Sequence, residues 1–156
     1  MNKAITTIGV VGVLTYCLPV MPASATSTKC SYMHIQYSDT VQPYAEGLIY
    51  KYELSVSCVN GMLSINGKTK SNSIMKHIGY KDIKIEYSSN GNTWYEEKSL
   101  DDMLKSDSSS YNLSSYTVSV KGGYYYRITC NHYAKEKGLF GSSQTVANTS
   151  NSVWID

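Results

Sequence analysis

Two cysteine–histidine pairs are close enough in sequence to be considered as a nucleophile and its base. Cys130 and His132 lie two residues apart, so on a β-strand their side chains point to the same face. Cys30 and His34 lie four residues apart near the start of the chain. A thiolate nucleophile needs an imidazole oriented by a third group, and an oxyanion donor. The sequence shows neither, so we favour a solvent-exposed His132 at a strand end and expect no enzymatic activity.

Adjacent carboxylates occur at Glu96–Glu97 and Asp101–Asp102. Neighbouring strand residues point to opposite faces, so such a pair cannot flank one glycosidic bond as hydrolytic carboxylates do. We therefore interpret both pairs as solvated charges. Ligand spacings for zinc or calcium, a phosphate-binding loop and a G-x-S-x-G motif are absent from the sequence. No cofactor and no metal is expected.

Alternation of apolar and polar residues with period two predicts the elements that would position these groups. Residues 48–58 alternate in this way, and Asn60–Gly61 then predicts a type I′ hairpin turn. Residues 66–79 are polar and irregular, 99–104 are expected to contain one or two helical turns, and 106–115 are expected to form a loop. Further strands are predicted at 63–65, 83–87, 93–95, 116–120, 124–130, 143–147 and 152–155.

About seven short strands with almost no helix predict an all-β fold, an antiparallel β-sandwich. Ile83 to Trp94, IKIEYSSNGNTW, resembles the hairpin of fibronectin type III and similar sandwich modules. Tyr124 to Cys130, YYYRITC, resembles their next-to-last strand. The resemblance implies an immunoglobulin- or fibronectin III-like sandwich. We expect this domain to span residues 44–156, and residues 26–43, which lack a clear period, to form a poorly ordered leader.

The first 25 residues have the pattern of a secretory signal peptide, which would be helical. Lys3 precedes an uncharged run over 5–20, and Ala23-Ser24-Ala25 supplies small residues for cleavage after Ala25. An uncleaved anchor is the alternative. No second apolar run of membrane length follows, so we expect a secreted mature protein without a membrane span.

If the protein is exported, its cysteines can form disulfides, because disulfides persist outside the cell. Cys30, Cys58 and Cys130 remain after the predicted cleavage, and Cys58 and Cys130 both lie in alternating segments. We favour a Cys58–Cys130 disulfide, with Cys30 free or paired between molecules. The alternative is three unpaired thiols, and the oligomeric state is left open.

Composition narrows the function further. The 156 residues carry a net charge of +2, only 17% of them are charged, and 15 are Tyr. A nearly neutral chain with Arg127 as its only arginine lacks the basic footprint of a nucleic-acid binder.

The segments Gly123–Arg127, Asn131–Lys135 and Val153–Ile155 resemble a family of small exported proteins of Gram-positive bacteria with no assigned activity. The leading hypothesis is a non-catalytic module that binds a cell-wall glycan or another extracellular protein. The Ser/Asn/Tyr-rich segments 106–115 and 142–152 are suited to adaptable contacts. The alternatives are a secreted antibacterial or toxin-like protein and, less favoured, a small hydrolase.

Overall fold

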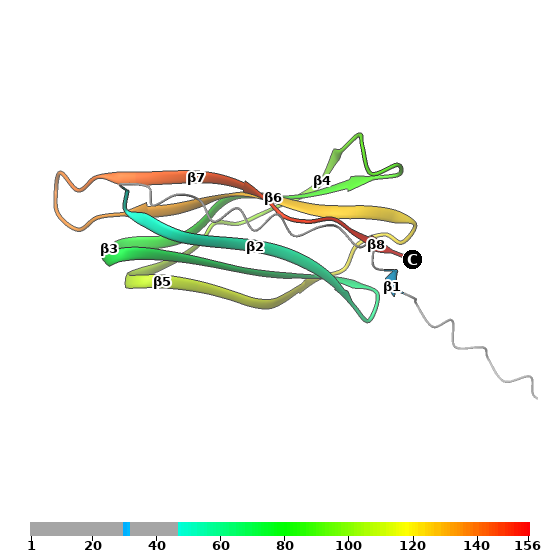
Figure 1. Ribbon diagram of the computed structural model, residues 1–156, viewed down its shortest axis with the longest axis horizontal. Coiled ribbons are helices and arrows are strands. Elements are labelled where there is room, and N and C mark those ends of the chain that lie inside the picture. The colour runs from blue at the N-terminus through cyan, green and yellow to red at the C-terminus, as the bar shows by residue number, and fades with distance from the viewer. Residues whose placement is uncertain (1–29, 32–46) are drawn as a thin grey trace, which may run out of the picture.

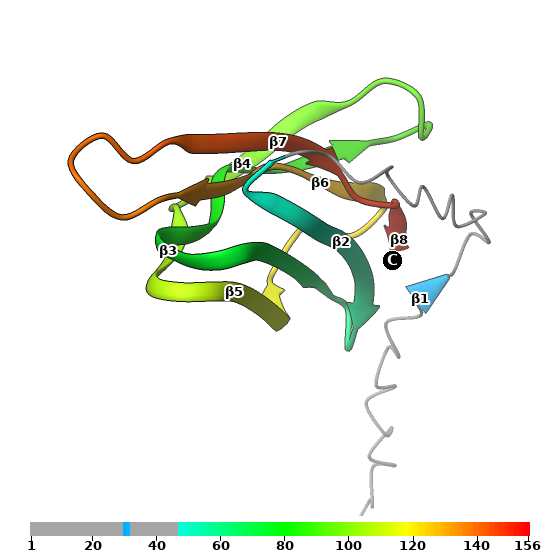
Figure 2. The same ribbon diagram turned by 60° about the vertical axis from the view of Figure 1, so that its left-hand side comes forward.

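The computed structural model describes residues 30–31 and 47–156, and within them every regular element is a β-strand. All strand pairs are antiparallel, and together they form one curled sheet (Figures 1 and 2). The predicted signal peptide at 1–25 lies outside the described residues, as does the predicted leader at 26–43 apart from 30–31. The strands are β1 (Cys30–Ser31), β2 (Ile49–Val59), β3 (Met62–Ser88), β4 (Tyr95–Leu100), β5 (Met103–Val118), β6 (Tyr124–Lys135), β7 (Ser143–Thr149) and β8 (Val153–Ile155).

The long strand β3 is the centre of the sheet. Its first part, up to Lys70, pairs with β2 on one side and β5 on the other. Beyond Met75 it pairs with β6 on one side and with β5 and then β4 on the other. The register shift between Lys70 and Met75 marks the corner at which the strand turns. The sheet therefore curls, as Figure 2 shows. Buried apolar side chains from both of its parts form one cluster.

The predicted β2–β3 hairpin is confirmed. Asn60 and Gly61 have φ angles of 51° and 74°, as a type I′ turn requires at both central positions. Cys58 then pairs with Leu63, and the alternation predicted for residues 48–58 places Val56 and Cys58 in the core. Burial of a Leu or Ile side chain contributes about 1.5–3 kcal/mol, so this pattern fixes the register of the hairpin. At the start of β2 the alternation fails, because the register shift between Ile49 and Lys51 buries Ile49 and leaves Tyr50 exposed.

Three expectations for polar segments were wrong. Residues 66–79 and 106–115 belong to β3 and β5, and 99–104 contain the end of β4 and the start of β5 rather than helical turns. Their Ser, Lys and Asn residues have low strand propensity, but β3 satisfies its backbone groups through ladders on both sides. Pairing with distant strands outweighed local preference here.

The predicted Cys58–Cys130 disulfide is also wrong. Cys130 is a free, buried thiol, and Cys58 is disulfide-bonded to a partner outside the described side chains. Both residues belong to one apolar cluster, as their alternation predicted. However, Cys58 lies beside the β2–β3 turn, whereas Cys130 lies opposite Asn148 within β6. Alternation selects the face of a side chain but not its level along the strand, and a disulfide needs both.

Candidate functional site

The outward side of β6 carries a group of interacting aromatic and charged side chains. Alternate β6 residues, from Tyr126 to Ala134, are buried, and the residues between them face out. We call these outward side chains the β6 face. They are Tyr125, Arg127, Thr129, Asn131 and Tyr133.

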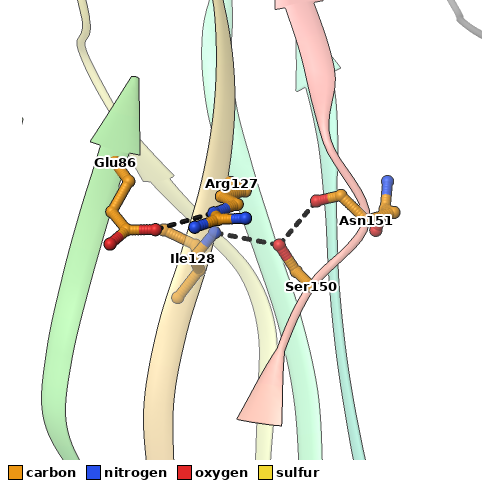
Figure 3. A network of polar contacts seen from close by, with 5 residues as sticks. All are labelled: Glu86, Arg127, Ile128, Ser150 and Asn151. Carbon is orange, nitrogen blue, oxygen red and sulfur yellow. Dashed lines mark hydrogen bonds and ion pairs between the residues drawn. The ribbon is translucent and has the colours of Figure 1, made fainter. Parts of the chain in front are cut away.

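The side chain of Arg127, on the β6 face, is held in position by two neighbouring groups. Its Nε donates to Glu86 Oε2 on β3 at 2.7 Å, and the two side chains are 28% and 19% exposed (Figure 3). The ring of Trp94 lies against the guanidinium, with 4.3 Å between its centroid and Cζ. A planar guanidinium held by a carboxylate and an aromatic ring has little freedom left. The three groups therefore present a preformed surface.

The segment between β7 and β8 holds this part of β6 in place. Ser150 Oγ accepts from the Ile128 amide at 2.9 Å and donates to the Asn151 carbonyl at 2.6 Å (Figure 3). The Asn151 side chain bonds to both backbone groups of Val56 on β2, at 3.0 Å and 2.9 Å. The backbone next to Arg127 is thus tied to the opposite part of the curled sheet.

A second aromatic pair continues the β6 face toward the end of the chain. Tyr125 and Trp154 form an edge-to-face pair with 4.9 Å between their centroids. The indole Nε1 of Trp154 donates to Asp156 at 2.6 Å. Gly91 lies against the Tyr125 ring, in a turn in which the Gly91 amide donates to Ser88 Oγ at 2.9 Å. These rings are half-buried, so their positions are set before any partner binds.

A hollow of about 490 Å³ opens at Thr129 and Asn131 of the β6 face, where β3, β6 and β7 meet. The register shift between Lys81 and Lys84 leaves Asp82 with a φ of 50°, and Asn131 Nδ2 donates to Asp82 Oδ2 at 2.8 Å. Lys84 binds Glu96 at 2.8 Å, which raises the pKa of Lys84 and lowers that of Glu96. The lining consists mainly of polar side chains: Tyr52, Asp82, Lys84, Thr129, Cys130, Asn131, Ala147, Asn148 and Thr149.

Cys130 and His132 share one face of β6, as predicted, but that face is the core. His132 is fully buried rather than exposed, which corrects the expectation of a solvated imidazole. Its Nδ1 lies 2.7 Å from Thr69 Oγ1, and its Nε2 lies 3.2 Å from Asn148 Nδ2. Burial lowers the pKa of His132 to about 4 and raises that of Cys130 to about 12. At neutral pH both groups are uncharged, and a buried protonated thiol is a poor nucleophile.

The other predicted chemical groups are separate from the β6 face or only border it. Cys30 and His34 have no described side chains. Glu96 binds Lys84 and Ser99, and Asp102 accepts from the Asp82 amide at 3.2 Å. Both exposed carboxylates are therefore hydrogen-bonded to neighbouring groups of the sheet. Among the described residues no group of three or more His, Cys, Asp or Glu side chains is placed to hold a metal ion.

Sequence reasoning missed the Trp94–Arg127–Glu86 cluster. Its only signal was that Glu86 and Arg127 occupy polar positions of two alternating strands. Trp94 precedes β4 and is far from Arg127 in sequence, so only the paired strands bring the two together. Of the polar segments proposed for binding, 106–115 belongs to β5, and 142–152 contains β7 and the connection from β7 to β8.

Comparison with protein-family models, curated proteins and solved structures finds no match for the chain. Within residues 30–31 and 47–156 there is also no helix with the length and apolar character needed to cross a membrane.

Proposed function

We propose that the protein is a secreted, non-catalytic binding module that contacts a neutral cell-surface glycan through the β6 face and the adjoining hollow. The proposal includes export through a signal peptide cleaved after Ala25, as in the small Gram-positive proteins that the sequence resembles. It also includes an immunoglobulin- or fibronectin III-like sandwich as the finer description of the curled sheet. The packing of Trp94 on Arg127, held by Glu86, is the observation that carries it.

The chemistry of the surface favours a saccharide. A sugar ring has apolar C–H faces and a rim of hydroxyls, so it needs aromatic surfaces next to hydrogen-bonding groups. Trp94 and the Tyr125–Trp154 pair supply the rings at one end, and Tyr133 supplies one at the other. Between them, the polar lining of the hollow supplies donors and acceptors.

Charge pairing favours a neutral saccharide over an anionic one. Arg127 is paired with Glu86, and Lys84 with Glu96. Lys81 lies over the Tyr133 ring at 4.6 Å and also approaches Asp102 at 3.6 Å. Each cation already has a partner, so an anionic ligand would have to displace an existing carboxylate.

The test is affinity electrophoresis in gels containing neutral polysaccharides, together with co-sedimentation with isolated Gram-positive cell wall. Trp94→Ala should reduce retention about tenfold, because an aromatic stacking contact contributes about 1–3 kcal/mol. The stability cost of this change should stay near 1 kcal/mol, the value of an exposed cation–π contact.

Tyr116→Ala is the matched control, since Tyr116 is 40% exposed on β5, away from the β6 face. It should bind as the wild type does. The proposal fails if the wild-type protein is retained by none of these materials. It also fails if Trp94→Ala and Tyr116→Ala bind equally well.

A further inference from the structure

The connection between β6 and β7 holds two large apolar side chains almost wholly in solvent. Leu139 and Phe140 are 92% and 95% exposed, whereas the next most exposed large apolar side chain, Ile74, is 58% exposed. This connection projects past the end of the sheet (Figure 1). Two such neighbouring side chains on a protrusion indicate a contact site, because water solvates them poorly.

The base of this tip is closed by hydrogen bonds. The Glu136 amide donates to the Ser142 carbonyl at 2.9 Å, and the Ser142 amide donates to a Glu136 carboxylate oxygen at 3.1 Å. Gly138, with a φ of 102°, allows the sharp reversal before the apolar pair. Lys137 Nζ lies 2.7 Å from Asp107 Oδ1 on β5. The fold thus holds Leu139 and Phe140 outward on a defined support.

The charge around the tip is positive. His77 on β3 pairs with Ser106 on β5 and with Lys135 on β6, so the strand ends below the tip are adjacent. The two carboxylates here, Glu136 and Asp107, are already engaged with the Ser142 amide and with Lys137. Four lysines belong to this end of the sheet: Lys76, Lys105 and Lys135 on the strand ends, and Lys137 in the connection, where it pairs with Asp107.

We propose that this tip inserts Leu139 and Phe140 into the interface of an anionic lipid bilayer, with the surrounding lysines at the headgroups. Two convex side chains bury far less than the roughly 1,000 Å² of a specific protein interface. Shallow insertion of apolar side chains combined with lysine attraction to anionic headgroups is sufficient for reversible membrane contact. The inference goes beyond the glycan proposal, because the tip and the β6 face are different surfaces and are tested by different variants.

The test is sedimentation of the purified protein with vesicles of phosphatidylcholine containing about 30% phosphatidylglycerol, compared with pure phosphatidylcholine. We expect binding to the anionic vesicles that weakens as salt is added. Leu139→Ser with Phe140→Ser should reduce partitioning about tenfold or more. Lys76→Gln with Lys135→Gln should reduce it about fivefold or more, with a smaller salt dependence.

Val59→Ser is the matched control, because Val59 is a 43% exposed apolar residue at the β2–β3 turn. It should partition as the wild type does, and Trp94→Ala should also leave vesicle binding unchanged. Absence of binding to anionic vesicles would overturn the inference, as would equal binding by the Leu139→Ser/Phe140→Ser variant. Photocrosslinking from position 140 on intact cells to a protein rather than to lipid would overturn it too.

Discussion

Removing the hydroxyl of Tyr80 should stabilise the protein. Tyr80 is 1% exposed, and its buried hydroxyl has no geometrically sound hydrogen bond in the described structure. The neighbouring Thr69 hydroxyl, which opposes part of the rise in the Tyr80 pKa, lies 2.7 Å from His132 Nδ1 and is engaged there. Burial raises the pKa of Tyr80, so the phenol stays protonated. A buried unsatisfied group destabilises the folded protein by about 1–3 kcal/mol. The small cavity left by the removed oxygen is itself destabilising and cancels part of this gain. We expect Tyr80→Phe to increase the free energy of unfolding by about 1 kcal/mol.

The matched comparison is Tyr126→Phe, another fully buried tyrosine of the same cluster. The Tyr126 hydroxyl donates to the Lys121 carbonyl at 2.7 Å, so its removal should instead cost about 1 kcal/mol. Urea unfolding and the thermal midpoint measure both variants, with expected changes of opposite sign and about 3 °C each. Destabilisation of Tyr80→Phe by as much as Tyr126→Phe would refute the reasoning, because it would show that the Tyr80 hydroxyl is bonded.

Gly67 gives an independent check of the same geometry. A Cβ at this position would lie 2.6 Å from the Tyr80 hydroxyl oxygen and 3.0 Å from the Glu53 carbonyl oxygen. Gly67→Ala should therefore cost about 2 kcal/mol alone, and less in the Tyr80→Phe background, where the closest contact is gone. Additive effects in the double variant would contradict the contact.

Three further predictions concern His132 and Cys130 in the core of β6 and the disulfide of Cys58 on β2. Burial lowers the pKa of His132 to about 4 from its usual 6.5, so the unfolded chain takes up a proton that the folded protein resists. The free energy of unfolding should be highest above pH 6.5 and should fall by about 3 kcal/mol as the pH drops toward 4. In His132→Gln the thermal midpoint should depend less on pH over this range. An unchanged pH dependence in the variant would contradict the prediction. Cys130, whose pKa burial raises to about 12, should resist iodoacetamide until the protein unfolds. Non-reducing peptide mapping should link Cys58 to Cys30, whose backbone pairs with Ile155 of the Cys58 cluster; a Cys58–Cys130 peptide would contradict the structure.

Local pattern predicted the all-β class and most of the short apolar strands. Asn60–Gly61 and the alternation on either side of it identify a hairpin, because turn geometry and side-chain period are both local properties. The strand character of residues 66–79 is not local, because it depends on backbone pairing with β5 and β6. The same limit applies to the candidate site. Glu86 and Arg127 occupy predictable outward positions, but the register that pairs them depends on the bulge between Lys81 and Lys84.

The buried polar groups were the least predictable feature. The spacing of Cys130 and His132 correctly placed them on one face, but it did not show which face is buried. Thr69 and Asn148 come from distant segments, and their bonds to His132 make its burial tolerable. The Cys130–His132 pair, which the sequence offered as a possible nucleophile and base, is therefore part of the core, where His132 has its hydrogen bonds.

The corner of β3 offers a place to divide the molecule. Residues 72–74 are exposed there, between the parts of the strand that pair with β2 and with β6. A chain break at this point would leave each fragment with a strand edge whose backbone groups are unpaired. The strand that pairs with this edge lies on the other fragment. The two pieces should therefore reassemble without a covalent link, so the protein is suited to fragment complementation or circular permutation at this corner.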